Sequence, residues 1–259
     1  MNGSSENNEK EMSFLEHLEE LRWRLIKSII AIFVGAIAAF FFSDLILELL
    51  LRPFKLAVQM QAEAGGNHEG ANAARLIFLA PTEGFMVRIK LAIFAGLFIA
   101  LPFVLYQLWK FVAPGLLEHE KKHIPRIVAF STFFFFLGAY FCYAVVIRYG
   151  LNFLLGYQSE ELVAQISIKE YLRFVTLLIL MFGIVFEMPV LTYFLTRMGI
   201  VTPEFMRQKR RYSIVIIFVL AAIITPPDPF TQLMLAMPLI ILYEVSIWVS
   251  KLVAPKAKA

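Results

Sequence analysis

Long apolar segments alternate with short polar ones along most of this chain. Six segments stand out, at residues 25–42, 84–112, 126–147, 171–196, 212–225 and 232–250. All but the short fifth segment approach or exceed the roughly 20 residues that a helix needs to cross a bilayer. The pattern therefore predicts an all-α integral membrane protein with six transmembrane helices.

Composition agrees with a membrane protein. Apolar residues make up 59% of the chain and charged residues 17%, against roughly 45–50% and 25% in soluble domains. The single cysteine, Cys142, excludes an intrachain disulfide and a cysteine-based metal site. Residues 1–12 form a polar tail without the apolar core of a signal peptide. We expect one membrane domain over 13–252 and a basic tail over 253–259.

Lysine and arginine accumulate in alternate connections. They are about twice as frequent around the tails and the second and fourth connections as on the opposite side. Because basic loops stay in the cytoplasm, this asymmetry predicts that both termini are cytoplasmic. The net charge of +4 is explained by the same bias and requires no nucleic-acid partner.

One of the three outer connections is long. The first, about 43–83, begins with a pattern that predicts an amphipathic helix on the membrane surface, interrupted at Pro53. We expect it to form an outer cap together with the third connection, about 148–170. The fifth connection, 225–229, is proline-rich and predicts a tight turn. Its short helical hairpin either thins the bilayer locally or is covered by a neighbouring subunit.

Glu187 is an acid within the long apolar fourth segment. A charge near the bilayer centre costs roughly 2.5–3.5 kcal/mol on insertion scales, so such residues usually face a cavity or a partner. Pro189 cannot donate a backbone hydrogen bond and predicts a helix bend beside this carboxyl. The alternatives are an acid bonded to another helix of the same protein, or the relay of a proton-coupled small-solute transporter.

The stretch before the first segment has the spacing of an amphipathic helix. Its apolar positions are Phe14, Leu18, Leu21 and Leu25. The glutamates Glu16, Glu19 and Glu20 lie between them, and Ser13 with Glu16 fits a capping box that starts the helix ahead of the membrane. On pattern alone, Glu20 paired with Arg24 one turn later is an ordinary surface pair, worth about 0.3–0.5 kcal/mol.

The second polar stretch, 106–126, contains a zinc-protease pattern. His119 and His123 are spaced as in H-E-x-x-H, with Glu120 between them. Two lysines lie between the histidines, Pro125 limits the helix, and no third ligand is evident where a catalytic zinc site needs three. A solvated turn in which Glu118 pairs with Lys122 is therefore favoured over a metal site.

Four motifs in register resemble the TatC family, the receptor subunit of the twin-arginine protein translocase. They are His17-Leu-Glu-Glu-Leu-Arg, Tyr106-Gln-Leu-Trp with Pro114-Gly-Leu-Leu-Glu-His-Glu, Phe182-Gly-Ile-Val-Phe-Glu-Met-Pro, and Thr225-Pro-Pro-Asp with Gln232. The resemblance runs from residue 13 to about 252. It implies six helices in a concave, cupped arrangement, with both termini inside.

The resemblance implies a binding site for signal peptides that carry paired arginines. Glu20 and Glu120 match the family's acids for this binding, and a carboxylate suits the bidentate guanidinium group. Arg22, Phe111 and Leu116 match further positions associated with recognition. Leu117 is a departure, because the family commonly has tyrosine there.

Other matched positions concern assembly. Glu187 matches the acid that lines the concave face, and Gln232 lies at a position associated with partner contact. Pro53 and Asp228 match outer-cap positions used in structure or assembly. The resemblance thus implies a non-enzymatic receptor without cofactors in the bacterial cytoplasmic (inner) membrane. It would bind folded cargo, recruit TatA- and TatB-type single-span proteins, associate with itself, and use the proton motive force.

Overall fold

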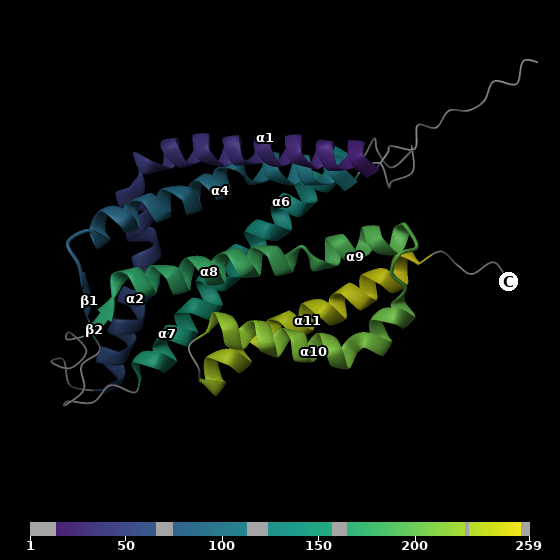
Figure 1. Ribbon diagram of the computed structural model, residues 1–259. Helices are drawn as coiled ribbons and strands as arrows, with labels where there is room; N and C mark the ends of the chain where they lie inside the picture. Colours follow the sequence, from purple (N-terminus) through teal and green to yellow (C-terminus); the bar gives the residue numbers. More distant parts are fainter. Residues whose placement is uncertain (1–13, 66–74, 113–123, 157–164, 226–227, 255–259) are drawn as a thin grey trace, which may run out of the picture.

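The described part of the chain is almost entirely helical. The computed structural model describes residues 14–65, 75–112, 124–156, 165–225 and 228–254 (Figure 1). Its helices are α1 (Phe14–Phe40), α2 (Ser43–Gly65), α4 (Glu83–Val112), α6 (Ile124–Phe141), α7 (Ile147–Leu155), α8 (Ile168–Phe186), α9 (Met188–Arg197), α10 (Pro203–Ile224) and α11 (Pro229–Val253). A π-helical turn, Cys142–Val146, joins α6 to α7, and two short strands are β1 (Arg75–Ile77) and β2 (Gln165–Ser167).

Five helical spans among the described residues are long and apolar enough to cross a membrane. They are Leu15–Phe40, Glu83–Val112, Ile124–Leu155, Ile168–Arg197 and Pro229–Val253. The sixth predicted segment lies in α10, which pairs with α11. Helix α10 begins nine residues before the predicted segment, on a charged stretch, so only its second half is continuously apolar.

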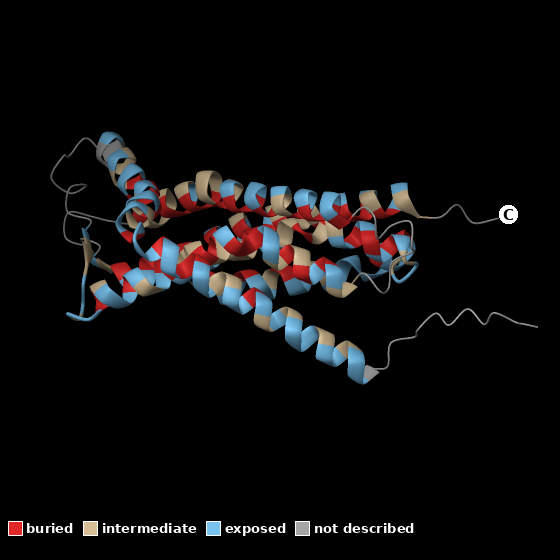
Figure 2. Cartoon of the chain, turned by 90° about the horizontal axis from the view of Figure 1, so that it is seen from above, coloured by how far each residue is buried: buried red, intermediate tan, exposed pale blue. Residues whose placement is uncertain are grey.

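The helices bury one face and expose the other (Figure 2), and many of the exposed side chains are large and apolar. On α1, for example, Ile29, Phe33 and Val34 are all more than half exposed. An apolar surface of this extent is costly in water but matches lipid hydrocarbon. The described helices therefore form a multi-pass membrane protein whose exposed faces meet lipid.

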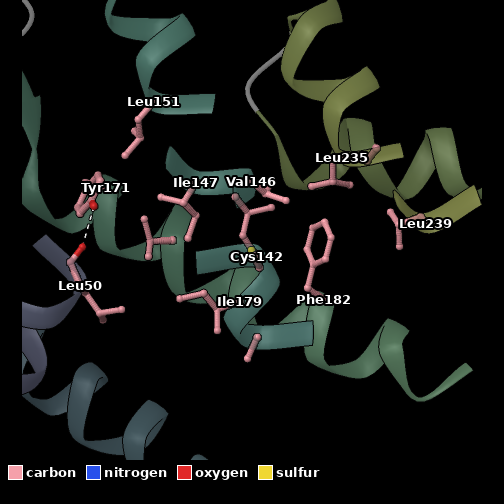
Figure 3. Close-up of a cluster of buried hydrophobic side chains, with 14 of the residues drawn as sticks. Leu50, Cys142, Val146, Ile147, Leu151, Tyr171, Ile179, Phe182, Leu235 and Leu239 are labelled. Carbon is pink, nitrogen blue, oxygen red and sulfur yellow. Dashed lines mark hydrogen bonds between the residues drawn. The ribbon is translucent and has the colours of Figure 1, made fainter. Parts of the chain in front are cut away.

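The largest buried cluster lies where α2, α7, α8 and α11 meet the π-helical turn. Cys142 and Phe182 are at most 1% exposed and lie near its centre (Figure 3), and Val175 is fully buried in the same cluster. Tyr171 extends from α8 to α2 and donates a hydrogen bond to the carbonyl of Leu50, 2.8 Å away. This cluster fixes α2 against the membrane-spanning helices.

Helix α2 continues through Pro53, so the predicted interruption at this residue is wrong. Proline lacks an N–H group and leaves the carbonyl four residues earlier without its helical donor. Here that carbonyl belongs to Leu49, and the hydroxyl of Tyr143 donates to it at 2.7 Å. The tyrosine restores the missing hydrogen bond, which allows a proline inside the helix.

The first and third connections meet at one end of the bundle, which we call the cap end. Strands β1 and β2 pair in parallel, with Leu76 opposite Ile166, and α2 packs against α7. The expectation that these connections form a joint cap is confirmed. The third apolar segment reaches Leu155, beyond the predicted 147, because α7 continues the helix into the cap. Both described termini lie at the opposite end, the termini end (Figure 1).

Candidate functional site

Helices α1 and α4 run antiparallel and pack along much of their length (Figure 1). They approach most closely at Gly96, where a Cβ atom would lie 2.4 Å from the backbone nitrogen of Ala36. Only a residue without a side chain fits this contact. The crossing brings the start of α1 beside the end of α4. There the ring of His17 stacks on Phe111, with centroids 4.3 Å apart and planes at 11°.

At this end of the bundle, Glu20 forms an ion pair with a cation of the same helix, Arg24. Arg24 donates to Oε1 of Glu20 from Nε at 2.8 Å and also from Nη2. Its Nη1 donates to Oε1 of Gln107 on α4 at 3.3 Å. The other oxygen, Oε2 of Glu20, is buried without a hydrogen-bond partner and lies 3.8 Å from Nδ1 of His17. The ordinary one-turn pair expected from the sequence is present and is linked to a second helix.

We call these five side chains, Glu20, Arg24, His17, Gln107 and Phe111, the rim cluster. They combine two cationic or ionisable donors, an acid, an amide and an aromatic ring within one contact between α1 and α4. Such a surface can bind a guanidinium group through the acid and an apolar side chain through the ring.

Several predicted residues are not brought to this cluster. Arg22 is exposed on α1. Leu116 and Glu120 lie outside the described residues, as do His119 and His123 of the zinc pattern. Across the described ranges, no group of three or more histidine, cysteine, aspartate or glutamate side chains is placed to hold a metal ion.

Glu187 lies at the break between α8 and α9, where it ends one helix and precedes the other. Pro189 follows at the second position of α9, so the bend expected from the sequence is confirmed. Glu187 as a whole is 8% exposed, and one oxygen of its carboxyl group is hydrogen-bonded to the hydroxyl of Ser131 on α6. The other oxygen, Oε1, is buried and has no hydrogen-bond partner among the described residues.

The Ser131 hydroxyl connects Glu187 to α4. Nε1 of Trp109 donates to Oγ of Ser131 at 3.0 Å, which leaves the serine O–H to donate to the carboxyl. Ser131 is 0% exposed and Trp109 2% exposed. Helices α6 and α8 also pack tightly here, because a Cβ at Gly183 would lie 2.6 Å from the ring of Phe135. The tight packing fixes the serine beside the acid.

Sequence reasoning missed Ser131 as the partner of Glu187. A serine in an apolar helix gives no sign of which neighbour it faces, since that depends on how α6 crosses α8. Trp109 lies within the Tyr106-Gln-Leu-Trp motif, and its indole N–H requires a partner when buried. That requirement was the one available signal.

The residues expected at assembly positions have internal contacts. Asp228 is the N-cap of α11 and accepts a hydrogen bond from the backbone N–H of Thr231 at 2.7 Å. The amide of Gln232 donates to the carbonyl of Phe218 on α10 at 3.1 Å. Asp228 therefore caps α11, and Gln232 joins α11 to α10 within the hairpin.

Comparisons with known proteins agree with these features. A sequence model of the family described as Sec-independent protein translocase protein (TatC) matches residues 16–238. Relatives with that description, from Aquifex aeolicus and Desulforapulum autotrophicum, are 42% and 41% identical. The matches cover 95% and 92% of this chain, and 98% and 84% of the relatives.

A solved structure has the same fold. A crystal structure described as the twin-arginine translocase receptor TatC is 41% identical, with a TM-score of 0.79. The match covers 92% of this chain and 99% of that one. The family match spans most of the chain, and its members are described as translocase proteins rather than enzymes. The chain therefore belongs to the TatC family of Sec-independent protein translocase proteins.

Proposed function

We propose that this protein is the signal-peptide receptor of a twin-arginine translocase. The observation that carries the proposal is the rim cluster, in which α1 and α4 place Glu20 and Phe111 on one contact. An arginine of the peptide would bind the carboxylate of Glu20 in bidentate fashion. The apolar part of the peptide would pack on Phe111 and Leu116.

Glu120 and Arg22 complete the proposed site. Glu120 would bind the second arginine, because two guanidinium groups need two carboxylates to be neutralised. Its segment follows α4 directly, so it starts from the same end of the bundle as Glu20. Arg22, which is exposed on α1, would contact the peptide backbone or its carboxyl groups. We take residues 13–252 as the single domain that carries this site.

Glu187 would bind a partner within the membrane. Its Oε1 atom is buried and unpaired, and an unpaired polar atom at membrane depth favours any helix that offers a donor. TatA- and TatB-type single-span helices are the partners that the family suggests. Gln232, whose amide nitrogen is already bound to α10, would offer a partner its carbonyl oxygen. Pro53 and Asp228 would act in assembly indirectly, by shaping α2 and the α10–α11 hairpin.

A peptide-binding measurement tests the receptor. Glu20→Ala and Glu120→Ala should each weaken binding of a twin-arginine peptide to the purified protein by about 1.5–3 kcal/mol, the range for hydrogen bonds to charged groups. A twin-lysine peptide should bind weakly to all variants. Glu19→Ala is the matched control, since Glu19 is the exposed neighbour of Glu20 on the same helix. Unchanged affinity in both variants would contradict the proposed site.

Orientation requires a separate test. We propose that the termini end faces the cytoplasm of a bacterial inner membrane, because most of the basic connections lie there. In a Cys142→Ser background, a cysteine at Gly66 should react with an impermeant thiol reagent added outside, and a cysteine at Gln208 should not. Labelling in the opposite sense would place the rim cluster on the wrong side for a cytoplasmic receptor.

A further inference from the structure

A cavity of about 250 Å³ lies at the cap end between the first turns of α4 and α8. Its walls include Val87, Leu91 and Leu172, each at most 5% exposed. The cationic side chains of Lys90, Lys169 and Arg173 also line it. Figure 1 shows both helices starting near the strands β1 and β2. The cavity thus combines an apolar interior with three cations at one end of the bundle.

The cations are within or at the start of membrane-spanning segments. Lys90 lies about two turns into the span Glu83–Val112, and Arg173 lies in the second turn of Ile168–Arg197. Charged side chains at such positions normally pair with another group. Lys90 and Lys169 have no carboxylate partner among the described residues, whereas the nearby Arg88 is paired with Asp44 at 2.8 Å.

The carboxylates nearby neutralise the cavity only in part, because Glu83 also lines it but three cations are present. Glu83 is buried and one of its oxygens accepts the backbone N–H of Leu79 at 2.8 Å. Glu170 lies 3.8 Å from Arg173 in an exposed pair, which is weak. The N-cap residue of α8, Ser167, makes no capping hydrogen bond, so the first turn of this helix adds positive potential.

We propose that this cavity binds the phosphate of an anionic phospholipid. The cations would bind the headgroup, and the acyl chains would extend along the apolar walls. Clustered lysine and arginine side chains attract an anionic headgroup through their opposite charge, and long lysine side chains extend toward the membrane interface to reach it. Such a lipid would bridge α4 and α8, and its phosphate would pair with Lys90 and Lys169, which have no carboxylate partner among the described residues.

Lipid binding to the delipidated, purified chain tests this site. Phosphatidylglycerol should bind more tightly than phosphatidylcholine, measured by native mass spectrometry. The variant Lys90→Gln/Lys169→Gln should lose about fivefold in affinity for each cation removed. Lys90→Arg/Lys169→Arg should retain binding, because the charge is kept. The control Lys55→Gln/Arg88→Gln removes the same charge from the same end outside this cavity, and should bind phosphatidylglycerol like the parent.

Three results would overturn the proposal. Equal losses in the test and control variants would indicate unspecific attraction to the charged surface. Equal binding of phosphatidylcholine would mean that the cations do not select the headgroup. Displacement of the lipid by inorganic phosphate would assign the site to a free anion. Thermal unfolding of each variant in detergent confirms that it is folded, so a loss of lipid is not a loss of structure.

Discussion

Glu20 and Glu187 lie in two regions that differ in how far they bury a carboxyl group and in the partner they give it. Glu20, at the termini end, is 22% exposed and forms an ion pair with Arg24 of the same helix. Glu187, in the break between α8 and α9, is 8% exposed, and the one hydrogen-bond partner of its carboxyl group among the described residues is the hydroxyl of Ser131. Each acid nevertheless keeps one oxygen, Oε2 of Glu20 and Oε1 of Glu187, without a hydrogen bond.

The difference follows from the surroundings. Near water, a carboxylate and a guanidinium can pair and separate at little cost, because solvent replaces the lost contact. Inside an apolar bundle a neutral hydroxyl is the less costly partner, since it brings no second charge. The rim cluster is thus suited to exchanging one guanidinium for another. The Glu187 site keeps one buried acceptor unpaired, and we propose that a helix arriving within the membrane would donate to it once the packing around it opens.

The largest predicted effect comes from a substitution that disturbs the contact between α1 and α4 and leaves the Glu187 region unchanged. Gly96→Ala places a Cβ atom 2.4 Å from the backbone of α1, so α1 must move away from α4. Overpacking of this kind costs about 1–3 kcal/mol of unfolding free energy. We expect lower stability in a denaturant titration and weakened twin-arginine peptide binding, because Glu20 moves away from Phe111.

The control for this experiment lies in the same helix. A Cβ at Gly84 would meet only the ring of Phe78, at 3.7 Å, which is ordinary contact. Gly84→Ala should therefore leave stability and peptide binding unchanged. Crosslinking of a partner helix near Glu187 should survive both substitutions. If Gly96→Ala binds the peptide as well as the parent, the contact between α1 and α4 does not build the site.

Much of the fold could be predicted from hydrophobic patterning. The segment 84–112 corresponds to α4, Glu83–Val112, because a long apolar run ends in polar residues on both sides. The path of α2 could not be predicted. Its continuation through Pro53 depends on Tyr143, which lies far away in the sequence. The continuation of the third span through α7 to Leu155 was also not predicted, because a charged residue, Arg148, and a glycine, Gly150, are typical of the end of a membrane span.

The candidate site was predictable in parts. Glu20 paired with Arg24 and Glu187 beside a bend follow from local spacing, and both are confirmed. The contacts with Gln107 and Ser131 depend on how two helices cross, which a single sequence does not contain. Local rules thus identify the acids, whereas tertiary packing decides which partner each acid has.

The second prediction concerns the unpaired oxygen of Glu187. Glu187→Ala removes the acceptor and should weaken crosslinking to a partner transmembrane helix by about 0.6–2 kcal/mol, the range for hydrogen bonds between helices in membranes. Glu187→Gln keeps a donor and an acceptor and should retain much of the binding. Peptide binding at the rim cluster should survive both changes, which would establish that the two regions act separately.

Two outcomes would change this interpretation. If Glu187→Gln fails as badly as Glu187→Ala, proton transfer explains the residue better than hydrogen bonding, and the solute-transporter alternative gains support. Uptake by the protein alone in vesicles would then be the next measurement. If neither variant alters crosslinking, Glu187 serves only the internal contact with Ser131.

The smallest effect concerns Arg24. Because its guanidinium occupies Oε1 of Glu20, an arginine of the peptide must compete with it. Partly exposed pairs are worth about 0.2–1 kcal/mol, so Arg24→Gln should bind a twin-arginine peptide up to about fivefold more tightly. It should also discriminate less against twin-lysine, since an ammonium no longer has to displace a bidentate guanidinium. Lys27→Gln, which removes an exposed charge from the same helix, should change neither affinity. Weaker binding in Arg24→Gln alone would mean that Arg24 orients Glu20 for the peptide and does not compete with it.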